Sequence, residues 1–229
     1  LLQSVAYIDF SRAFDSVPHA KLLCKLQAYG ISGSLLQWIT DFLSNINHCT
    51  RVGASYSSVK TIRSGVVQGS CLGPILFLIY VNDIVEVFDN NVSNKLYADD
   101  IKLYSIIRTH TDCVNLQCNL DRLYEWADKW QLQISYGKCG FINLCNTSST
   151  INCCYNINAN ILQQQTRVCD LGVNIDERLN FSSHIDIIRR KAHTRANLIL
   201  RCFLSKNCDS LSKAFEVYVR PLLEYCFVI

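Results

Sequence analysis

Two adjacent acidic residues, Asp99 and Asp100, lie inside the otherwise apolar and aromatic stretch LYADDIKLY, from Leu96 to Tyr104. Like charges repel, and burying either carboxylate among apolar side chains is costly. A third carboxylate, Asp9, falls near the end of the strand-like run SVAYIDF, where an unpaired charge would also be costly. A hard divalent cation such as Mg²⁺ would satisfy all three, since carboxylate oxygens are the ligands it prefers.

Carboxylates of this kind indicate phosphoryl-transfer chemistry. Two metal ions about 3.5–4 Å apart can hold both the attacking and the leaving oxygens of such a reaction. The end of a strand and a tight hairpin are rigid places to mount the ligands. For an isolated Asp-Asp pair, the alternative is a solvated turn without chemistry.

A glycine-rich segment, SGVVQGSCLGP (Ser64–Pro74), is a candidate binding loop. Its three glycines allow the backbone to approach a ligand closely. Gln68 adds a neutral side chain that both donates and accepts hydrogen bonds. The alternative is a flexible loop that precedes a helix.

The apolar pattern predicts the elements that must position these residues. Ser4–Phe10 reads as a buried strand, and KLYADDIKLY reads as two short strands around an acidic turn. The residues from Pro74 onward are apolar almost all round, which predicts a deeply buried helix. Leu116 to Trp130 has the spacing of a helix that packs one face on a sheet. Helices capped by Ser16 and Ser34 are expected upstream.

The remaining segments are a strand and then mostly helices. Cys139–Cys145 reads as a strand, residues 147–165 as a loop or weak hairpin, and Thr166–Phe181 as a turn-linked β unit. From His184 onward the apolar spacing is helical, and a second helix from Ser210 is limited or kinked by Pro221. Mixed strands and helices followed by helices alone predict an α+β domain and then a small helical one.

Composition sets the broad class of protein. The chain has 229 residues, of which 49% are hydrophobic, and this favours a globular protein over a disordered one. A formal net charge of +3 does not by itself indicate a nucleic-acid partner. Thirteen cysteines without metal-ligand spacing predict free, mostly buried thiols in a reducing compartment. No membrane span is expected, and the lack of methionine predicts an internal fragment of a longer polypeptide.

Four motifs together resemble those of a known family. AYIDFSRAFDSVPH, SGVVQGSCLGPILFLIYVNDI, LYADD and CDLGV follow in the order and spacing of reverse transcriptases. They look most like those of non-LTR (LINE-type, jockey-like) retrotransposons, and the resemblance runs from palm motif A into the thumb. Val67 and Ser135 depart from the family, which usually has proline and asparagine at these positions.

The resemblance implies an α+β polymerase palm, with a ferredoxin-like split βαβ arrangement and an antiparallel sheet, followed by a small helical thumb. It implies a palm over residues 1–165, with the fingers missing upstream. A primer-grip hairpin is expected over residues 166–182, and a thumb, incomplete, over residues 183–229.

The resemblance also implies roles for the acidic residues. Asp9, Asp99 and Asp100 would be the catalytic metal ligands, with Asp99 the firmer assignment of the adjacent pair. Lys138 matches the motif D lysine, a candidate proton donor to the leaving pyrophosphate. A solvated surface lysine is the alternative.

A second group of residues would contact the incoming nucleotide. The backbone carbonyl of Phe10 would lie near the metal site, and Gln68 and Gly69 match motif B, which lies against nucleotide and template. Phe14 matches the aromatic steric gate that excludes a ribose 2′-hydroxyl, and a core phenylalanine is its alternative. Asp15 belongs to the family's Ala-Phe-Asp signature and is expected to be structural first.

A third group would hold nucleic acid. Leu171 and Gly172 would be the tip of the primer grip. The basic residues that follow would track the backbone of a template–primer by salt-sensitive phosphate contacts, and a merely solvated helix face is the alternative. These residues are Arg189, Arg190, Lys191 and Arg195.

The implied activity is RNA-directed DNA polymerisation by a two-metal nucleotidyl transfer. The implied cofactors are two Mg²⁺ ions, with Mn²⁺ as a possible substitute. The implied partners are an RNA template with a DNA primer and deoxynucleoside triphosphates, in an intracellular location, nuclear or cytoplasmic. An RNA-dependent RNA polymerase is a rival that Phe14 argues against. An inactive, truncated element fragment that binds nucleic acid without polymerising is the other alternative.

Overall fold

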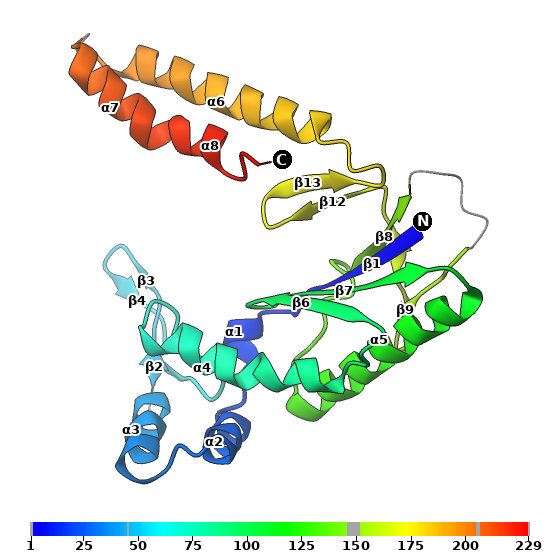
Figure 1. The fold of residues 1–229 in the computed structure, drawn as a ribbon. Helices are drawn as coiled ribbons and strands as arrows, with labels where there is room; N and C mark the ends of the chain where they lie inside the picture. Colours follow the sequence, from blue (N-terminus) through cyan, green and yellow to red (C-terminus); the bar gives the residue numbers. More distant parts are fainter. Residues whose placement is uncertain (1, 45, 146–151, 205–206, 229) are drawn as a thin grey trace. The chain divides into compact units, whose positions relative to one another are not determined.

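The computed structural model describes residues 2–44, 46–145, 152–204 and 207–228. The chain divides into two compact units (Figure 1). Unit 1 comprises Leu1–Phe141 with Thr147–Gln164, and unit 2 comprises Ile142–Asn146 with Gln165–Ile229. Both strands and helices are present, so the predicted mixed α+β class is confirmed at that level.

A five-stranded sheet in the order β11-β8-β1-β7-β6 underlies the fold. Its strands are β1 (Leu2–Ile8), β6 (Ser93–Tyr97), β7 (Asp100–Ile107), β8 (Gly140–Cys145) and β11 (Gln163–Gln164). β7 pairs antiparallel with both β1 and β6, as predicted. The prediction of an antiparallel sheet is wrong at the other edge, where β11 pairs parallel with β8. A crossover connection brings β11 back in the direction of β8, as a parallel pair requires.

Helices alternate with these strands in a β-α-β-β-α-β order. The two helices of this repeat are α4 (Leu72–Val81), between β1 and β6, and α5 (His110–Trp130), between β7 and β8. Between β1 and α4 lie the helices α1 (Ala13–Ser16), α2 (His19–Ala28) and α3 (Gly33–Leu43). The 3-10 helix η1 (Asn82–Val87) continues from α4. Short pairs complete the unit: β2 (Asn47–His48) with β5 (Lys60–Thr61), β3 (Arg51–Val52) with β4 (Ser55–Tyr56), and β9 (Asn156–Ile157) with β10 (Asn160–Ile161).

Three local predictions about helices are wrong. Ser16 does not cap α2, because its hydroxyl donates to the Ala13 carbonyl at 3.2 Å, and Pro18 takes the N-cap position. α3 begins one residue before the predicted cap, with Ser32 at its N-cap. α4 is not buried all round: Ile75 is 53% exposed and Leu78 is 52% exposed. An apolar run of this length does not reveal which of its faces will meet a neighbour.

A buried ion pair joins α2 to η1. Lys25 is 4% exposed, and its Nζ lies 2.5 Å from Oδ1 of Asp83. Nζ also donates to the Tyr80 carbonyl at 2.5 Å and lies 3.7 Å from the ring centroid of Trp130. Burial lowers the pKa of Lys25 to about 8, although Asp83 opposes the shift. Burial likewise raises the pKa of Tyr80.

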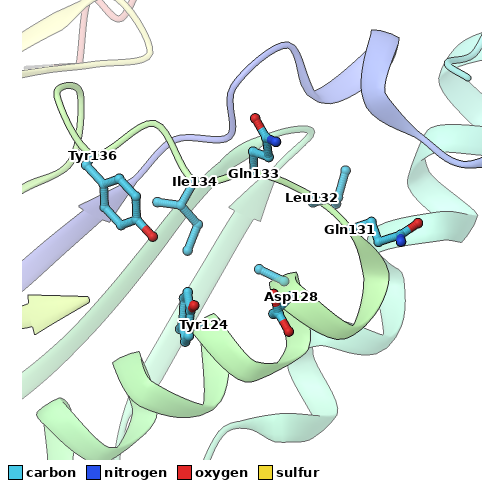
Figure 2. A pocket seen from close by; sticks show the side chains of 8 residues that line it. Tyr124, Asp128, Gln131, Leu132, Gln133, Ile134 and Tyr136 are labelled. Atoms are coloured by element: carbon cyan, nitrogen blue, oxygen red, sulfur yellow. The ribbon is translucent and has the colours of Figure 1, made fainter. Parts of the chain in front are cut away.

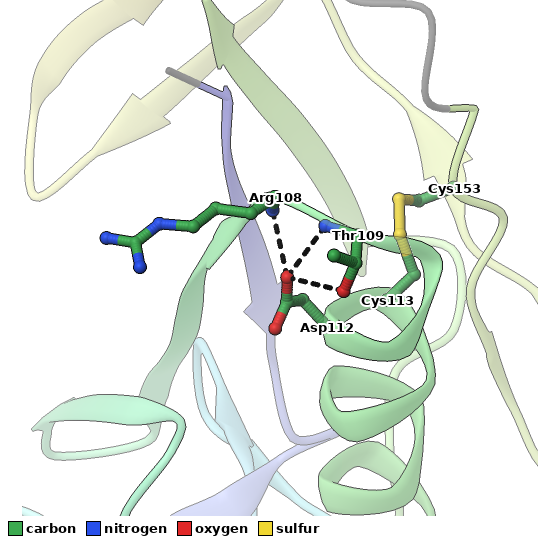
Figure 3. The surroundings of a disulfide bond; sticks show 5 residues. All are labelled: Arg108, Thr109, Asp112, Cys113 and Cys153. Atoms are coloured by element: carbon green, nitrogen blue, oxygen red, sulfur yellow. Dashed lines mark hydrogen bonds between the residues drawn. A yellow bond between two sulfur atoms is a disulfide. The ribbon is translucent and has the colours of Figure 1, made fainter.

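The junction of β7 and α5 carries a capping box and a disulfide (Figure 3). Oδ2 of Asp112 accepts from the backbone N–H groups of Arg108 and Thr109 at 2.9 and 2.8 Å. These hydrogen bonds hold the pKa of Asp112 below its usual value. The next residue, Cys113, is bonded to Cys153.

The prediction of free cysteines is confirmed for most of those described, whereas the prediction that they are mostly buried is wrong, and one pair is bonded. Cys113 and Cys153 are paired, and Cys139 is the one buried free thiol among the described residues. The two cysteines are 40 residues apart in the sequence, so no local sequence pattern predicts the bond between them. Burial raises the pKa of the Cys139 thiol.

Apart from its share of β8, the described part of unit 2 forms a β hairpin and three helices. Its elements are β12 (Arg167–Asp170), β13 (Val173–Asp176), α6 (Ser182–Cys202), α7 (Cys208–Tyr218) and α8 (Arg220–Glu224). Pro221 lies in the first turn of α8, so the predicted break at this proline is confirmed. A small core of Ala192, Ile199, Ala214 and Val219 joins the helices. In the described parts of the chain, no helix combines the length and the apolar character that a membrane crossing demands.

Candidate active site

The strand register brings the predicted acidic residues to one end of the sheet. The last pair of β1 and β7 is Ile8 with Ile101. Asp9 directly follows Ile8 and Asp100 directly precedes Ile101, so both acids lie at this end of the paired strands.

The acidic turn is a two-residue hairpin. Tyr97 of β6 pairs with Asp100 of β7, which leaves Ala98 and Asp99 as the connection. This confirms two strands around an acidic turn. Ala98 has φ 54°, a left-handed conformation that costs a non-glycine residue about 1 kcal/mol or more. The hairpin therefore presents Asp99 at its tip through a locally strained backbone.

Asp9 is paired with Lys138. Nζ of Lys138 lies 3.3 Å from both carboxylate oxygens of Asp9. The Ser135 N–H donates to the Asp9 carbonyl at 2.8 Å, and the Ser135 carbonyl accepts from the Lys138 N–H at 2.8 Å. These bonds hold the turn that carries Lys138 beside the end of β1. The side chain of Lys138 remains 67% exposed, and that of Asp9 is 25% exposed.

The three acids fit a hard cation in the type of donor they offer. Asp9 already holds one cationic group, the Lys138 ammonium, through both oxygens. Within the described residues, no group of three or more His, Cys, Asp or Glu side chains is gathered as a metal site would require. The structure thus brings the three acids to one end of the sheet without assembling them into a coordination shell.

The glycine-rich loop is tied to the segment that follows Asp9. Nε2 of Gln68 donates to Oδ1 of Asp15 at 2.9 Å, and the Ser64 hydroxyl donates to the Asp15 carbonyl at 3.0 Å. Gly65 has φ +92°, and a Cβ there would lie 2.7 Å from the Asp15 carbonyl oxygen. Asp15, expected to be structural, therefore positions Gln68, a contact for which the sequence held no signal of its own.

Two glycines of this loop have different reasons to be glycine. A Cβ at Gly73 would lie 2.5 Å from the Val67 carbonyl oxygen, so Gly73 permits a close approach inside the protein. Gly69 has φ +82° and open space around it. Gln68 and Gly69 are both exposed, so this part of the loop is accessible to a ligand.

The two predicted phenylalanines occupy different environments. Phe10 is 2% exposed, and its ring lies 6.4 Å from that of Trp126, so only its backbone is available to a site. Phe14 is half-buried and stacks on Phe77 of α4, with ring centroids 4.1 Å apart. Phe14 therefore combines a packed face, as its core alternative requires, with a partly accessible one.

In unit 2, Leu171 and Gly172 form the turn of the β12–β13 hairpin, as predicted. Both have positive φ, 45° and 86°, which suits the twist of a two-residue hairpin turn. The Tyr225 hydroxyl donates to the Leu171 carbonyl at 2.6 Å. The hairpin tip is therefore held by a residue that follows α8, while the Leu171 side chain is 40% exposed.

The predicted basic residues lie on α6 and are all exposed. Arg189 donates to Oδ1 of Asp186 at 3.2 Å, an exposed pair one turn apart. A groove of about 450 Å³ between α6 and the following helices is lined by Arg189 and Arg190 together with apolar side chains, among them Phe215 and Leu223. These cations therefore border an apolar surface rather than a uniformly solvated one.

A further pocket contains none of the predicted residues. A pocket of about 540 Å³ lies between α5 and the segment that leads to Lys138. Figure 2 shows Tyr124 and Asp128 on the helix, and Ile134 and Tyr136 on the segment. The Ser11 N–H donates to the Gln133 carbonyl at 2.7 Å, so the pocket wall is bonded to the chain beyond Asp9.

Comparisons with known proteins agree with the motif order. Residues 2–175 match the family model of the reverse transcriptase (RNA-dependent DNA polymerase). The RNA-directed DNA polymerase from mobile element jockey of Drosophila funebris is 32% identical over 97% of this chain. The jockey protein of Drosophila melanogaster is 28% identical over 96%, and the probable RNA-directed DNA polymerase from transposon BS is 28% identical over 94%. The chain spans 25% of the length of each relative.

Solved structures share the fold. Telomerase from Candida tropicalis, in complex with the TWJ fragment of telomeric RNA, has a TM-score of 0.57 over 99% of this chain and 39% of its own. The apo form of this telomerase, truncated from its C-terminal domain, has a TM-score of 0.55 over 78% of this chain and 35% of its own. The identities are 11% and 12%, so the likeness concerns the fold. The resemblance drawn from the motifs is confirmed by the family match and the mobile-element relatives.

Proposed function

The chain belongs to the reverse transcriptase (RNA-dependent DNA polymerase) family, and on that premise we propose that it carries the polymerase centre of an enzyme that copies RNA into DNA. The observation that carries the proposal is the register of β1 and β7. This register ends at Ile8 and Ile101, so Asp9 and Asp100 lie at the same end of the paired strands, and Asp99 lies in the adjoining hairpin turn. These acids lie within the residues that match the family.

We further propose a polymerase palm for residues 1–165, a primer-grip hairpin for residues 166–182 and a helical thumb for residues 183–229. The β-α-β-β-α-β order of unit 1 and the helices of unit 2 support this division. The fold shared with telomerase supports it as well.

At the centre, Asp9, Asp99 and Asp100 would hold two divalent cations, Mg²⁺ or in its place Mn²⁺. When bound, these ions would supply a lowered pKa for the primer 3′-hydroxyl and positive charge beside the leaving pyrophosphate. Lys138 pairs with Asp9 in the absence of other cations. Its exposed ammonium would release Asp9 and donate a proton to the pyrophosphate.

Around the centre, Phe14, Gln68 and Gly69 would contact the incoming deoxynucleotide. The accessible part of the Phe14 ring would exclude a ribose 2′-hydroxyl by contact. Asp15 fixes the Gln68 amide, so Gln68 is a preorganised contact rather than a freely rotating one. The Phe10 carbonyl would complete the lining from the backbone.

The template–primer would be held mainly from unit 2. Leu171 and Gly172 would contact the primer end, and Tyr225 fixes the carbonyl at that tip. The cations of α6 would bind phosphates, while the apolar part of their groove would meet sugars. These cations are Arg189, Arg190, Lys191 and Arg195.

The test is extension of a DNA primer on an RNA template in the presence of Mg²⁺. The protein would be a polypeptide of the length of the curated relatives that contains these 229 residues. We expect incorporation of deoxynucleotides and its loss in Asp99→Asn. Asp41→Asn, which removes an exposed carboxylate of α3, is the matched control and should extend the primer normally. A folded wild-type polypeptide that binds the hybrid but incorporates nothing would refute the proposal and identify an inactive remnant.

A further inference from the structure

A second basic surface lies outside the site described above. We call residues 46–64 the basic arm; it contains the pairs β2–β5 and β3–β4. Every residue from 47 to 61 is exposed. Figure 1 shows the β3–β4 hairpin extending away from the five-stranded sheet. An isolated two-stranded hairpin is marginally stable in water, so a surface of this kind gains order from what it binds.

All charged side chains of the basic arm are positive. Arg51, Lys60 and Arg63 are its charged residues, and no acidic residue lies between Asp41 and Asp83. The charges of these three residues sum to +3, which equals the formal net charge of the whole chain. The charges of all other residues therefore cancel. None of the three forms an ion pair with any of the described acids. In contrast, Lys25, Arg122, Lys138, Arg189 and Arg220 each have a carboxylate partner.

The tip of the arm holds an aromatic ring against one of these cations. Arg51 and Tyr56 are directly opposed in the β3–β4 register, and the guanidinium carbon lies 5.5 Å from the ring centroid. Nε of Arg51 donates to the Gly53 carbonyl at 2.8 Å, which fixes the guanidinium. Tyr56 is 63% exposed. A fixed arginine beside an exposed ring is a stacking platform for an unpaired base.

The base of the arm is attached to the proposed nucleotide loop. Ser64 forms a bridge with Pro18, and its hydroxyl donates to the Asp15 carbonyl. Asp15 in turn accepts from Gln68. The arm and Gln68 are therefore anchored to the same residue.

We propose that the basic arm binds the single-stranded RNA template ahead of the point of copying. Arg51, Lys60 and Arg63 contact phosphates, and Tyr56 stacks on a base. This inference rests on the proposed function, because only a polymerase that copies RNA has such a strand beside Gln68. Positive charge without acidic partners selects a polyanion, and an exposed ring selects one whose bases are unstacked.

The test measures binding of the 229-residue chain to a fluorescein-labelled oligouridine and to an RNA–DNA hybrid over a range of salt concentrations. One variant combines Arg51→Gln, Lys60→Gln and Arg63→Gln. The matched control combines Arg108→Gln, Lys129→Gln and Lys213→Gln, which removes the same charge from exposed positions elsewhere. Thermal unfolding of each variant verifies that it is folded.

For the arm variant we expect weaker binding of the oligouridine and a plot of log K against log[salt] shallower by about 2, from three lost phosphate contacts. The control variant should keep a slope close to that of the wild type. Tyr56→Ala should weaken oligouridine binding about tenfold, while Tyr56→Phe retains it.

Three results would overturn the inference. Equal slopes for the arm and control variants would show that the arm is not a contact. Loss of hybrid binding with unchanged oligouridine binding would assign the arm to duplex instead of single strand. A wild-type chain that binds neither nucleic acid would overturn the proposed function and the arm with it, whereas the first two results leave the proposed function standing.

Discussion

Lys25–Asp83 and Lys138–Asp9, both in the described part of unit 1, are lysine–aspartate pairs that differ sharply in exposure. Lys25 and Asp83 are 2.5 Å apart, with the lysine 4% exposed. Lys138 and Asp9 are 3.3 Å apart, with the lysine 67% exposed. Each pair joins segments that are distant in the sequence, by 58 and 129 positions.

The difference lies in what surrounds the ammonium. Lys25 lies 4.8 Å from the ring centroid of Tyr80, 4.7 Å from that of Trp126 and 3.7 Å from that of Trp130. The rings and the Tyr80 carbonyl replace water, so this ion pair cannot open without loss of packing. The Lys138 ammonium faces solvent and can exchange Asp9 for water or another ion.

The comparison indicates that the buried pair stabilises the fold, whereas the exposed pair leaves its aspartate available for catalysis. A buried pair is costly to break from one side, and an exposed pair contributes little to stability. Asp9 must be free to bind another cation if it is catalytic, and the exposed pair allows this. Asp83 has no such freedom.

The largest effect should come from Asp9→Asn. Loss of one charge at the proposed centre should slow primer extension about 10³-fold or more, since this charge acts on the transition state. The free energy of unfolding should change by less than about 1 kcal/mol, because the pair with Lys138 is exposed. Primer-extension rates and urea unfolding measure the two effects. Retained extension would remove Asp9 from the centre.

Asp83→Asn should show the opposite pattern. It leaves the Lys25 ammonium buried without its acid, which should cost about 3 kcal/mol of unfolding free energy. Urea unfolding of the 229-residue chain measures the cost, and Asp41→Asn on α3 is the exposed control. A cost below about 1 kcal/mol would mean that the rings alone stabilise the ammonium, and the comparison of the two pairs would fail.

Lys138→Gln, at the exposed pair, should lower the rate of primer extension without a matching loss of stability. Removal of a proton donor should slow extension about 10²-fold. The unfolding free energy should change by less than about 0.5 kcal/mol. Lys129→Gln, another exposed lysine of unit 1, should leave both quantities unchanged. An extension rate equal to that of the wild type would identify Lys138 as a solvated surface lysine.

The sequence predicted the elements that local pattern controls. The acidic turn between β6 and β7 was evident because apolar residues flank Asp99 and Asp100 on both sides. The four- and three-residue spacing of Leu116 to Trp130 predicted α5, and the pattern of Thr166–Phe181 predicted a turn-linked β unit, in which the family resemblance placed the tip at Leu171 and Gly172. The family resemblance then predicted that Asp9, Asp99 and Asp100 act together at one site.

The same reasoning could not predict contacts that depend on the assembled fold. Lys25 lies between Leu22 and Leu26 on the inward face of α2, and this spacing was an available sign of burial. Its partner Asp83 could not be identified, because 58 positions separate the two. The parallel pairing of β11 with β8 and the Cys113–Cys153 bond could not be predicted for the same reason. Each joins segments that are separated in the sequence, and no local pattern marks the contact.

The smallest expected effect is a pH dependence of stability that belongs to Lys25 alone. The folded-state pKa of about 8 lies below the ordinary value of 10.5, so above pH 8 the unfolded chain binds more protons than the folded one. Stability therefore rises with pH from about 8. Above pH 10 the raised pKa of Tyr80 acts in the opposite direction, because the unfolded tyrosine loses its proton first.

The window from pH 8 to pH 10 thus isolates the lysine. Lys25→Met removes the titration, so the stability of wild type relative to this variant should rise by about 2 kcal/mol across the window. Subtracting the stability of the variant from that of the wild type removes the contributions of the thiols and other titrating groups that both proteins share. A flat difference for Lys25→Met would mean that Asp83 and the rings stabilise the buried charge as well as water does, and the two pairs would then differ in exposure alone.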